Sequence, residues 1–102
     1  MSGRISTTVA FAFGNQTVSN TALTLEAFTA FTQEQIDRAN RIIVTVETQS
    51  IRYRYDGTAP TDAIGHLLTS GSRLELVGND NIQNLKVIRV TTDATVMVTL
   101  EE

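Results

Sequence analysis

The chain has 102 residues, 41% of them hydrophobic, with a formal net charge of −3 at pH 7, one histidine and no cysteine. A chain of this length is expected to form one domain, over residues 1–102, with a substantial core. Its composition excludes disulfide bonds, and the acidic balance argues against nucleic acid as a partner. It has no apolar run long enough to cross a membrane and no signal-peptide pattern, so we expect no membrane partner and synthesis in a cytoplasm.

The N-terminal segment alternates apolar and polar residues, which predicts a strand from about Arg4 to Phe13. The apolar row, expected on one face of a sheet, consists of Ile5, Thr7, Val9, Phe11 and Phe13. Residues 14–16 are turn formers expected to end this strand, and residues 17–25 are expected to hold one or two short strands. Two alternatives stay open for residues 1–20: a strand of the chain's own core, or an arm exchanged with a neighbouring subunit.

A short helix is predicted over residues 33–39. Thr32 and Gln35 have the spacing of a capping box, in which the threonine hydroxyl accepts a backbone N–H and the glutamine side chain reaches back. The apolar residues around it recur roughly at the spacing of one helical face: Phe28, Phe31, Ile36 and Ala39. We expect this helix to close one end of a β core.

From Arg41 onward, short alternating runs are separated by small polar turns. We expect strands over residues 41–48, 51–55, 65–69, 73–77, 85–91 and 95–100. Residues 78–81 are expected to form a turn, and the last two strands a hairpin through residues 92–94. Seven or eight mostly antiparallel strands with one short helix predict an all-β fold, either a compact β-sandwich or a small barrel.

Some strands carry apolar residues on both faces, whereas the outer faces of a lone sandwich are usually polar. Ile43, Met97 and either Val87 or Ile88 therefore need a second cover. That cover is either the N-terminal segment or short helix of the same chain, or another subunit. We take all four residues as candidate interface positions.

Reactive chemistry is sparse, and we expect no enzyme, no cofactor and no metal site. Zinc sites and metal-binding β-barrels need several histidines or cysteines, and this chain has only His66. The enzymatic alternative would pair His66 with Asp56 or Asp62, but no nucleophile motif supports it.

Tyr53 and Tyr55 alternate with Arg52 and Arg54, so strand geometry sends the aromatic and basic side chains to opposite faces. This argues against a nucleic-acid platform, and we expect the rings to be buried with their hydroxyls at the edge. If the two tyrosines are exposed, a carbohydrate-binding β-sandwich becomes the alternative of another class.

Several segments of the second half resemble known proteins in their residue pattern: residues 44–48, 51–61, 65–68, 71, 74–76, 88–90 and 93–96. On these segments the chain resembles small structural proteins of tailed-bacteriophage virions. The resemblance implies a virion location and a β-rich capsid decoration or cementing protein, with a head–tail joining or tail structural protein as the alternative. It implies the major capsid protein or another virion protein as partner. Closed symmetry favours a homo-oligomer, with a trimer preferred.

Overall fold

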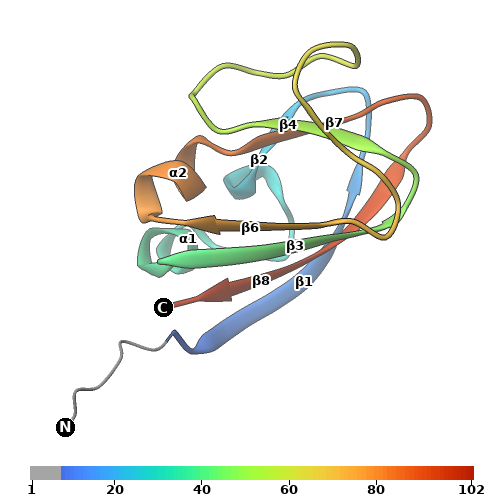
Figure 1. Cartoon of the computed structure of the whole chain (residues 1–102). Helices are drawn as coiled ribbons and strands as arrows, with labels where there is room; N and C mark the ends of the chain where they lie inside the picture. Colours follow the sequence, from blue (N-terminus) through green and yellow to red (C-terminus); the bar gives the residue numbers. More distant parts are fainter. Residues whose placement is uncertain (1–7) are drawn as a thin grey trace, which may run out of the picture.

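The structure, a computed structural model, describes residues 8–102 as two four-stranded antiparallel sheets packed face to face (Figure 1). The first sheet has the order β1-β8-β3-β6, with bounds Ala10–Val18, Ala94–Glu101, Arg41–Thr48 and Arg73–Val77. The second sheet has the order β2-β7-β4-β5, with bounds Leu23–Thr24, Lys86–Arg89, Ile51–Arg54 and His66–Leu68. The predicted all-β class is confirmed, in its sandwich form.

The core lies between the sheets and is built from alternate residues of the strands. One alternate row of each of β3, β6 and β8 faces inward, and its residues are all buried: Ile42, Val44, Val46, Leu74, Leu76, Val96, Val98 and Leu100. Burying each such side chain contributes about 1.5–3 kcal/mol, so these rows hold the two sheets together.

Strand β1 differs from its prediction in both extent and facing. It runs through Gly14 to Val18, so the expected break at residues 14–16 is wrong. A bulge between Ala10 and Ala12 sets two residues against one of β8, which places both Phe11 and Ala12 toward the core. Phe13 is thereby turned to the outer face, away from Phe11. The part of this prediction on residues 4–7 lies outside the described residues.

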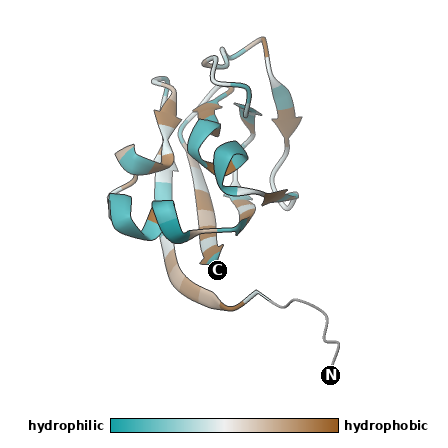
Figure 2. Ribbon diagram, turned by 90° about the vertical axis from the view of Figure 1, so that its left-hand side faces the viewer, coloured by the Kyte–Doolittle hydropathy of each residue, from teal (hydrophilic) through white to brown (hydrophobic). Residues whose placement is uncertain are grey.

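Two short helices lie at one end of the sandwich, and Figure 2 shows them as mostly hydrophilic in colour. The first, α1, spans Gln33–Arg38 and confirms the predicted helix. Its capping box is complete, because the Gln35 backbone N–H donates to the Thr32 hydroxyl and the Thr32 N–H donates to the Gln35 side chain. A single turn of 3-10 helix, η1, precedes it at Leu25–Ala27.

The second helix, α2, spans Asn79–Asn84, where a turn was expected. Ile82 and Leu85 are fully buried and anchor it to the core, although the segment is too polar to show helical periodicity. The Asn79 side chain donates to the carbonyl oxygens of Ile36 at 2.9 Å and Ala39 at 2.8 Å, at the end of α1. Contacts with a distant helix therefore stabilise a segment whose local sequence favours a turn.

The expected last hairpin is also wrong, because β7 and β8 belong to different sheets. β7 pairs with β2 and β4, whereas β8 pairs with β1 and β3. Val87 and Val96 face the same core from opposite sheets. The short connection between the two strands therefore crosses from one sheet to the other instead of folding back.

Candidate functional site

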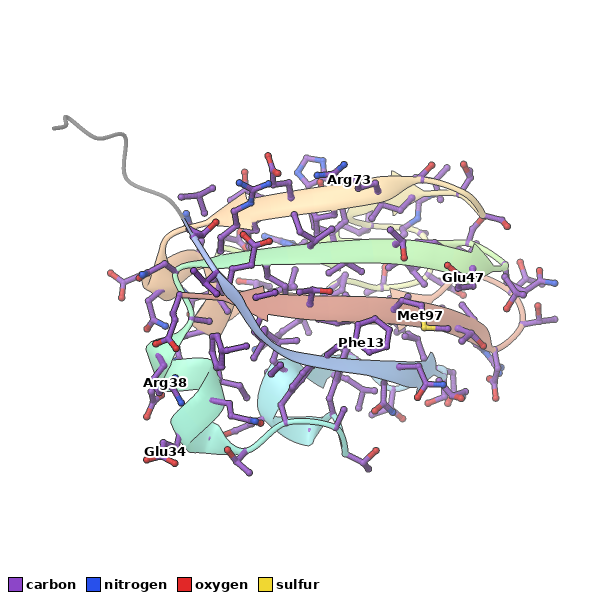
Figure 3. All side chains as sticks on the ribbon, turned by 90° about the horizontal axis from the view of Figure 1, so that it is seen from below. Phe13, Glu34, Arg38, Glu47, Arg73 and Met97 are labelled. Atoms are coloured by element: carbon purple, nitrogen blue, oxygen red, sulfur yellow. The ribbon has the colours of Figure 1, made fainter. Side chains whose placement is uncertain are left out.

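The outer face of the first sheet carries a group of mostly apolar side chains that extends from the edge strand β1 across β8 to β3. Phe13, Thr99 and Ile43 lie in one cross-strand row, since Thr99 pairs with both of the others. Met97 lies two residues along β8, diagonal to Phe13 and Ile43 on the same face. Figure 3 views this face directly and shows Phe13 and Met97 close together. We call these four residues the apolar patch.

Phe13 is the most exposed member of the apolar patch. Its side chain is 65% exposed, whereas Ile43, Met97 and Thr99 are half-buried by their neighbours. Burial of this exposed phenyl ring against a second surface would stabilise the resulting complex.

Polar and charged side chains border the apolar patch. Arg41 forms ion pairs with Glu75 and with Glu101, the latter at 3.4 Å, and Arg73 lies 3.3 Å from Glu75. Asn15 and Thr45 flank Met97 on the neighbouring strands. An apolar centre with a polar rim of both charge signs is the usual composition of a protein–protein contact surface.

A shallow hollow adjoins the apolar patch along the first half of β1. It has a volume of about 360 Å³ and is lined by Ala10, Phe11, Ala12, Phe13 and Thr99. The guanidinium of Arg38 lies over the Phe11 ring, 4.5 Å from its centroid. The same edge of the molecule therefore has a protruding ring and a hollow next to it.

The four candidate interface residues are divided between this face and the other sheet. Ile43 and Met97 lie together in the apolar patch. Val87 faces the core and is 2% exposed. Ile88 points to the opposite side of β7, is 9% exposed, and lines an open pocket of about 450 Å³ together with the buried Pro60.

The loop of residues 55–65 lies beside Ile88, because Pro60, Thr61 and Asp62 line the same pocket, together with Asn20 of the N-terminal segment. This loop was not among the covers expected from the sequence. Figure 1 shows this loop arching over the β4 and β7 side of the sandwich. Arg52 fixes it by donating to the carbonyl oxygens of Asp62 and Gly65, both at 3.0 Å.

Phe13 was missed as a candidate because strict alternation put it in the same row as Phe11. The bulge depends on how β1 pairs with β8, and the local sequence of residues 10–13 does not indicate it.

A second feature is an open cleft at the end of β4 and β5, facing α2. Its volume is about 490 Å³, and its lining includes Tyr55, His66 and Ile64 together with Asn81 of α2. The rings of Tyr53, Tyr55 and His66 form an aromatic trio, with centroids 5.1 to 6.5 Å apart and planes inclined by 19° to 37°. We call this feature the aromatic cleft.

The two tyrosines differ in burial. The Tyr53 ring packs against the core, and burial raises the pKa of its hydroxyl. Tyr55 is 40% exposed and faces the aromatic cleft. The Tyr53 ring is therefore partly buried, as expected, and Tyr55 is exposed. Only one of the two tyrosines meets the condition that was set for the carbohydrate alternative.

Arg54 and Asp56 form an ion pair at the rim of the aromatic cleft. The hydrogen bond from Arg54, with a smaller contribution from the Thr58 backbone N–H, lowers the pKa of Asp56 to about 2. The carboxylate is therefore ionised and engaged at neutral pH, which makes it a poor proton acceptor for catalysis.

The structure brings His66 and Asp56 to the same cleft, whereas Asp62 lines a different cavity beside Ile88. No hydrogen bond joins His66 to Asp56 in the described part of the chain, where Asp56 binds Arg54 instead. Among residues 8–102, no three acidic, histidine or cysteine side chains gather closely enough to hold a metal ion.

No protein-family model, curated protein or solved structure matches this chain. Within residues 8–102, neither α1 nor α2 has the length and apolar character needed to cross a membrane.

Proposed function

We propose that this protein is a structural subunit that acts by packing against copies of itself through the apolar patch. The observation that carries the proposal is Phe13, a large apolar side chain that is 65% exposed on the outer face of the edge strand β1. Its neighbours Ile43 and Met97 extend the apolar area across three strands. In this role the protein binds and packs, and it catalyses no reaction.

A second copy of the chain is the occupant that the surface fits best. The rim of the patch carries both Arg73 and Glu75, so two copies can place opposite charges against each other. The protruding Phe13 ring and the hollow beside it let each copy insert a side chain and receive one. We propose that this insertion runs head to tail, with each copy filling the hollow of the next one. A head-to-tail contact can close into a ring, and we propose a trimer.

We further propose that the assembly belongs to a tailed-bacteriophage virion, as a capsid decoration or cementing protein bound to the major capsid protein. The support is the sequence resemblance over residues 43–96, together with a small β-sandwich that presents an apolar face. A head–tail joining or tail structural role uses the same surface and differs only in its position on the particle.

The self-association proposal is tested by sedimentation equilibrium of the purified protein. Wild type is expected to sediment as an oligomer, and Phe13→Thr and Ile43→Thr as monomers with unchanged circular dichroism. Threonine keeps the strand propensity while removing apolar area. Leu67→Thr is the matched control, because Leu67 is an exposed apolar strand residue on the second sheet.

A wild-type protein that stays monomeric at high micromolar concentration would contradict the self-association proposal. So would an oligomer that Phe13→Thr and Leu67→Thr weaken equally. The virion assignment is tested separately, by electron microscopy of phage particles labelled with an antibody to this protein. Label on the capsid surface supports decoration, label at the neck or tail supports the alternative, and unlabelled particles contradict the assignment.

A further inference from the structure

The aromatic cleft is a surface that the proposed packing role does not use. It lies at the end of the second sheet beside α2, whereas the apolar patch lies on the outer face of the first sheet. Its lining includes the exposed side chains of Tyr55 and His66, and the Tyr53 ring packs next to both, with centroids 6.3 Å and 5.1 Å away. The exposed Ile64 adds an apolar wall.

Polar atoms stand at the rim of the aromatic cleft. Asn81 uses its side-chain N–H to bind the Val77 carbonyl at 3.0 Å, which holds its amide oxygen as a free acceptor. Arg54 donates to Asp56 through Nε and one Nη, so its other Nη remains available as a donor. An apolar floor with a few directional polar groups is the composition of a small-molecule site.

The charge of the aromatic cleft indicates an uncharged ligand. Arg54 and Asp56 neutralise each other in their ion pair, so neither acts as a free charge that would select an anion or a cation. A ligand that fits must offer a flat apolar face to the rings and several hydroxyl groups to the rim. Sugars have this combination, since one face of a pyranose ring presents C–H groups and its edge presents hydroxyls.

From these features we infer that the aromatic cleft binds a neutral saccharide. Tyr55 and His66 stack against the C–H face of one sugar ring, and Asn81 and the Arg54–Asp56 pair bind its hydroxyls. The cleft volume of about 490 Å³ suits one or two sugar units in an open site. This assignment does not depend on self-association, because none of the patch residues lines the cleft.

The test is a titration of isotope-labelled protein followed by two-dimensional NMR, which detects weak binding. Cellobiose, maltose and chitobiose serve as neutral probes, and glucose 6-phosphate and sialic acid as anionic probes. With at least one neutral probe we expect saturable shifts in the backbone amides of Tyr55, His66 and Asn81. Tyr55→Ala should weaken that binding by about tenfold or more, equivalent to about 1.4 kcal/mol.

Two controls separate a saccharide site from a disturbed fold. Tyr55→Phe keeps the ring and should retain most of the binding, and Phe13→Thr should retain all of it, whatever the oligomeric state. The inference is overturned if none of the neutral probes gives saturable shifts, or if Tyr55→Ala binds as well as wild type. Binding of the anionic probes alone would also overturn it, because it would mean that the Arg54–Asp56 pair opens to receive a charge.

Discussion

Gly14 of β1 lies directly against Ala30, and a Cβ placed on Gly14 would come within 2.2 Å of the Ala30 Cβ. The backbone N–H of Thr29 donates to the Gln16 side chain at 3.1 Å, so the segment before α1 is held along the edge of β1. This contact covers part of an edge strand that would otherwise be free to pair.

Gly14→Ala is therefore expected to destabilise the protein by about 1–3 kcal/mol, through a clash with Ala30. The double variant Gly14→Ala/Ala30→Gly moves the methyl group to the other side of the contact and should recover most of the loss. The measurement is the free energy of unfolding in urea for both single variants and the double variant. A double variant no more stable than Gly14→Ala would contradict the proposed contact.

Asn79 is expected to be a strong contributor to stability, since its side-chain N–H group holds the end of α1 against α2. Asn79→Ala leaves the carbonyls of Ile36 and Ala39 without this donor and should cost about 1–3 kcal/mol. Asn79→Asp should cost more, because a carboxylate would face the carbonyl oxygens. Thermal unfolding measures both, and Asn84→Ala, on the exposed side of α2, is the control that should change little.

Removal of the capping box should destabilise α1 in proportion to the hydrogen bonds that are lost. Thr32→Ala is expected to cost about 1 kcal/mol, whereas Thr32→Ser keeps the hydroxyl that accepts the Gln35 N–H and should cost less. Urea unfolding followed by circular dichroism compares the two variants. Equal losses for Ala and Ser would mean that the threonine methyl, not the cap, stabilises this end of the helix.

The ion pair at the aromatic cleft predicts a specific acid titration. The pKa of Asp56 is about 2 in the folded protein, below its ordinary 3.8, mainly because Arg54 binds the carboxylate. Because the folded-state pKa is the lower one, its stabilising contribution is present above pH 3.8 and is lost as the pH falls towards 2. In Arg54→Gln the NMR titration midpoint of Asp56 should rise towards 3.8, and an unchanged midpoint would exclude Arg54 as the cause.

Local patterns were sufficient for the features that depend on a few neighbouring residues. The capping box at Thr32 and Gln35 is complete within one helical turn, so its spacing could be recognised without any knowledge of the fold. The inward rows of β3 and β8 follow from the alternation of side chains along an extended backbone. Of the candidate interface residues, Ile43 and Met97 were recognised in the same way, as apolar residues on an outward-facing row.

Features that depend on distant partners could not be recognised in this way. Helix α2 is polar and forms because Asn79 binds the end of α1 and Ile82 is buried. The aromatic cleft joins His66 to Tyr53 and Tyr55 only because β5 pairs with β4. The loop beside Ile88 contains turn residues. Such residues indicate that the chain bends there, but they do not indicate which surface the loop covers.

By itself, the sequence determined the all-β class, the positions of most strands and the side chains that each of β3, β6 and β8 buries, because a two-residue period is a property of the extended backbone. Only the tertiary structure decided that β7 and β8 join different sheets and that Phe13 faces outward. The partner of a strand depends on competition among all the strand edges that can pair. A one-residue bulge moves every later side chain of its strand to the other face of the sheet. The surface proposed here for self-association is thus a product of strand pairing.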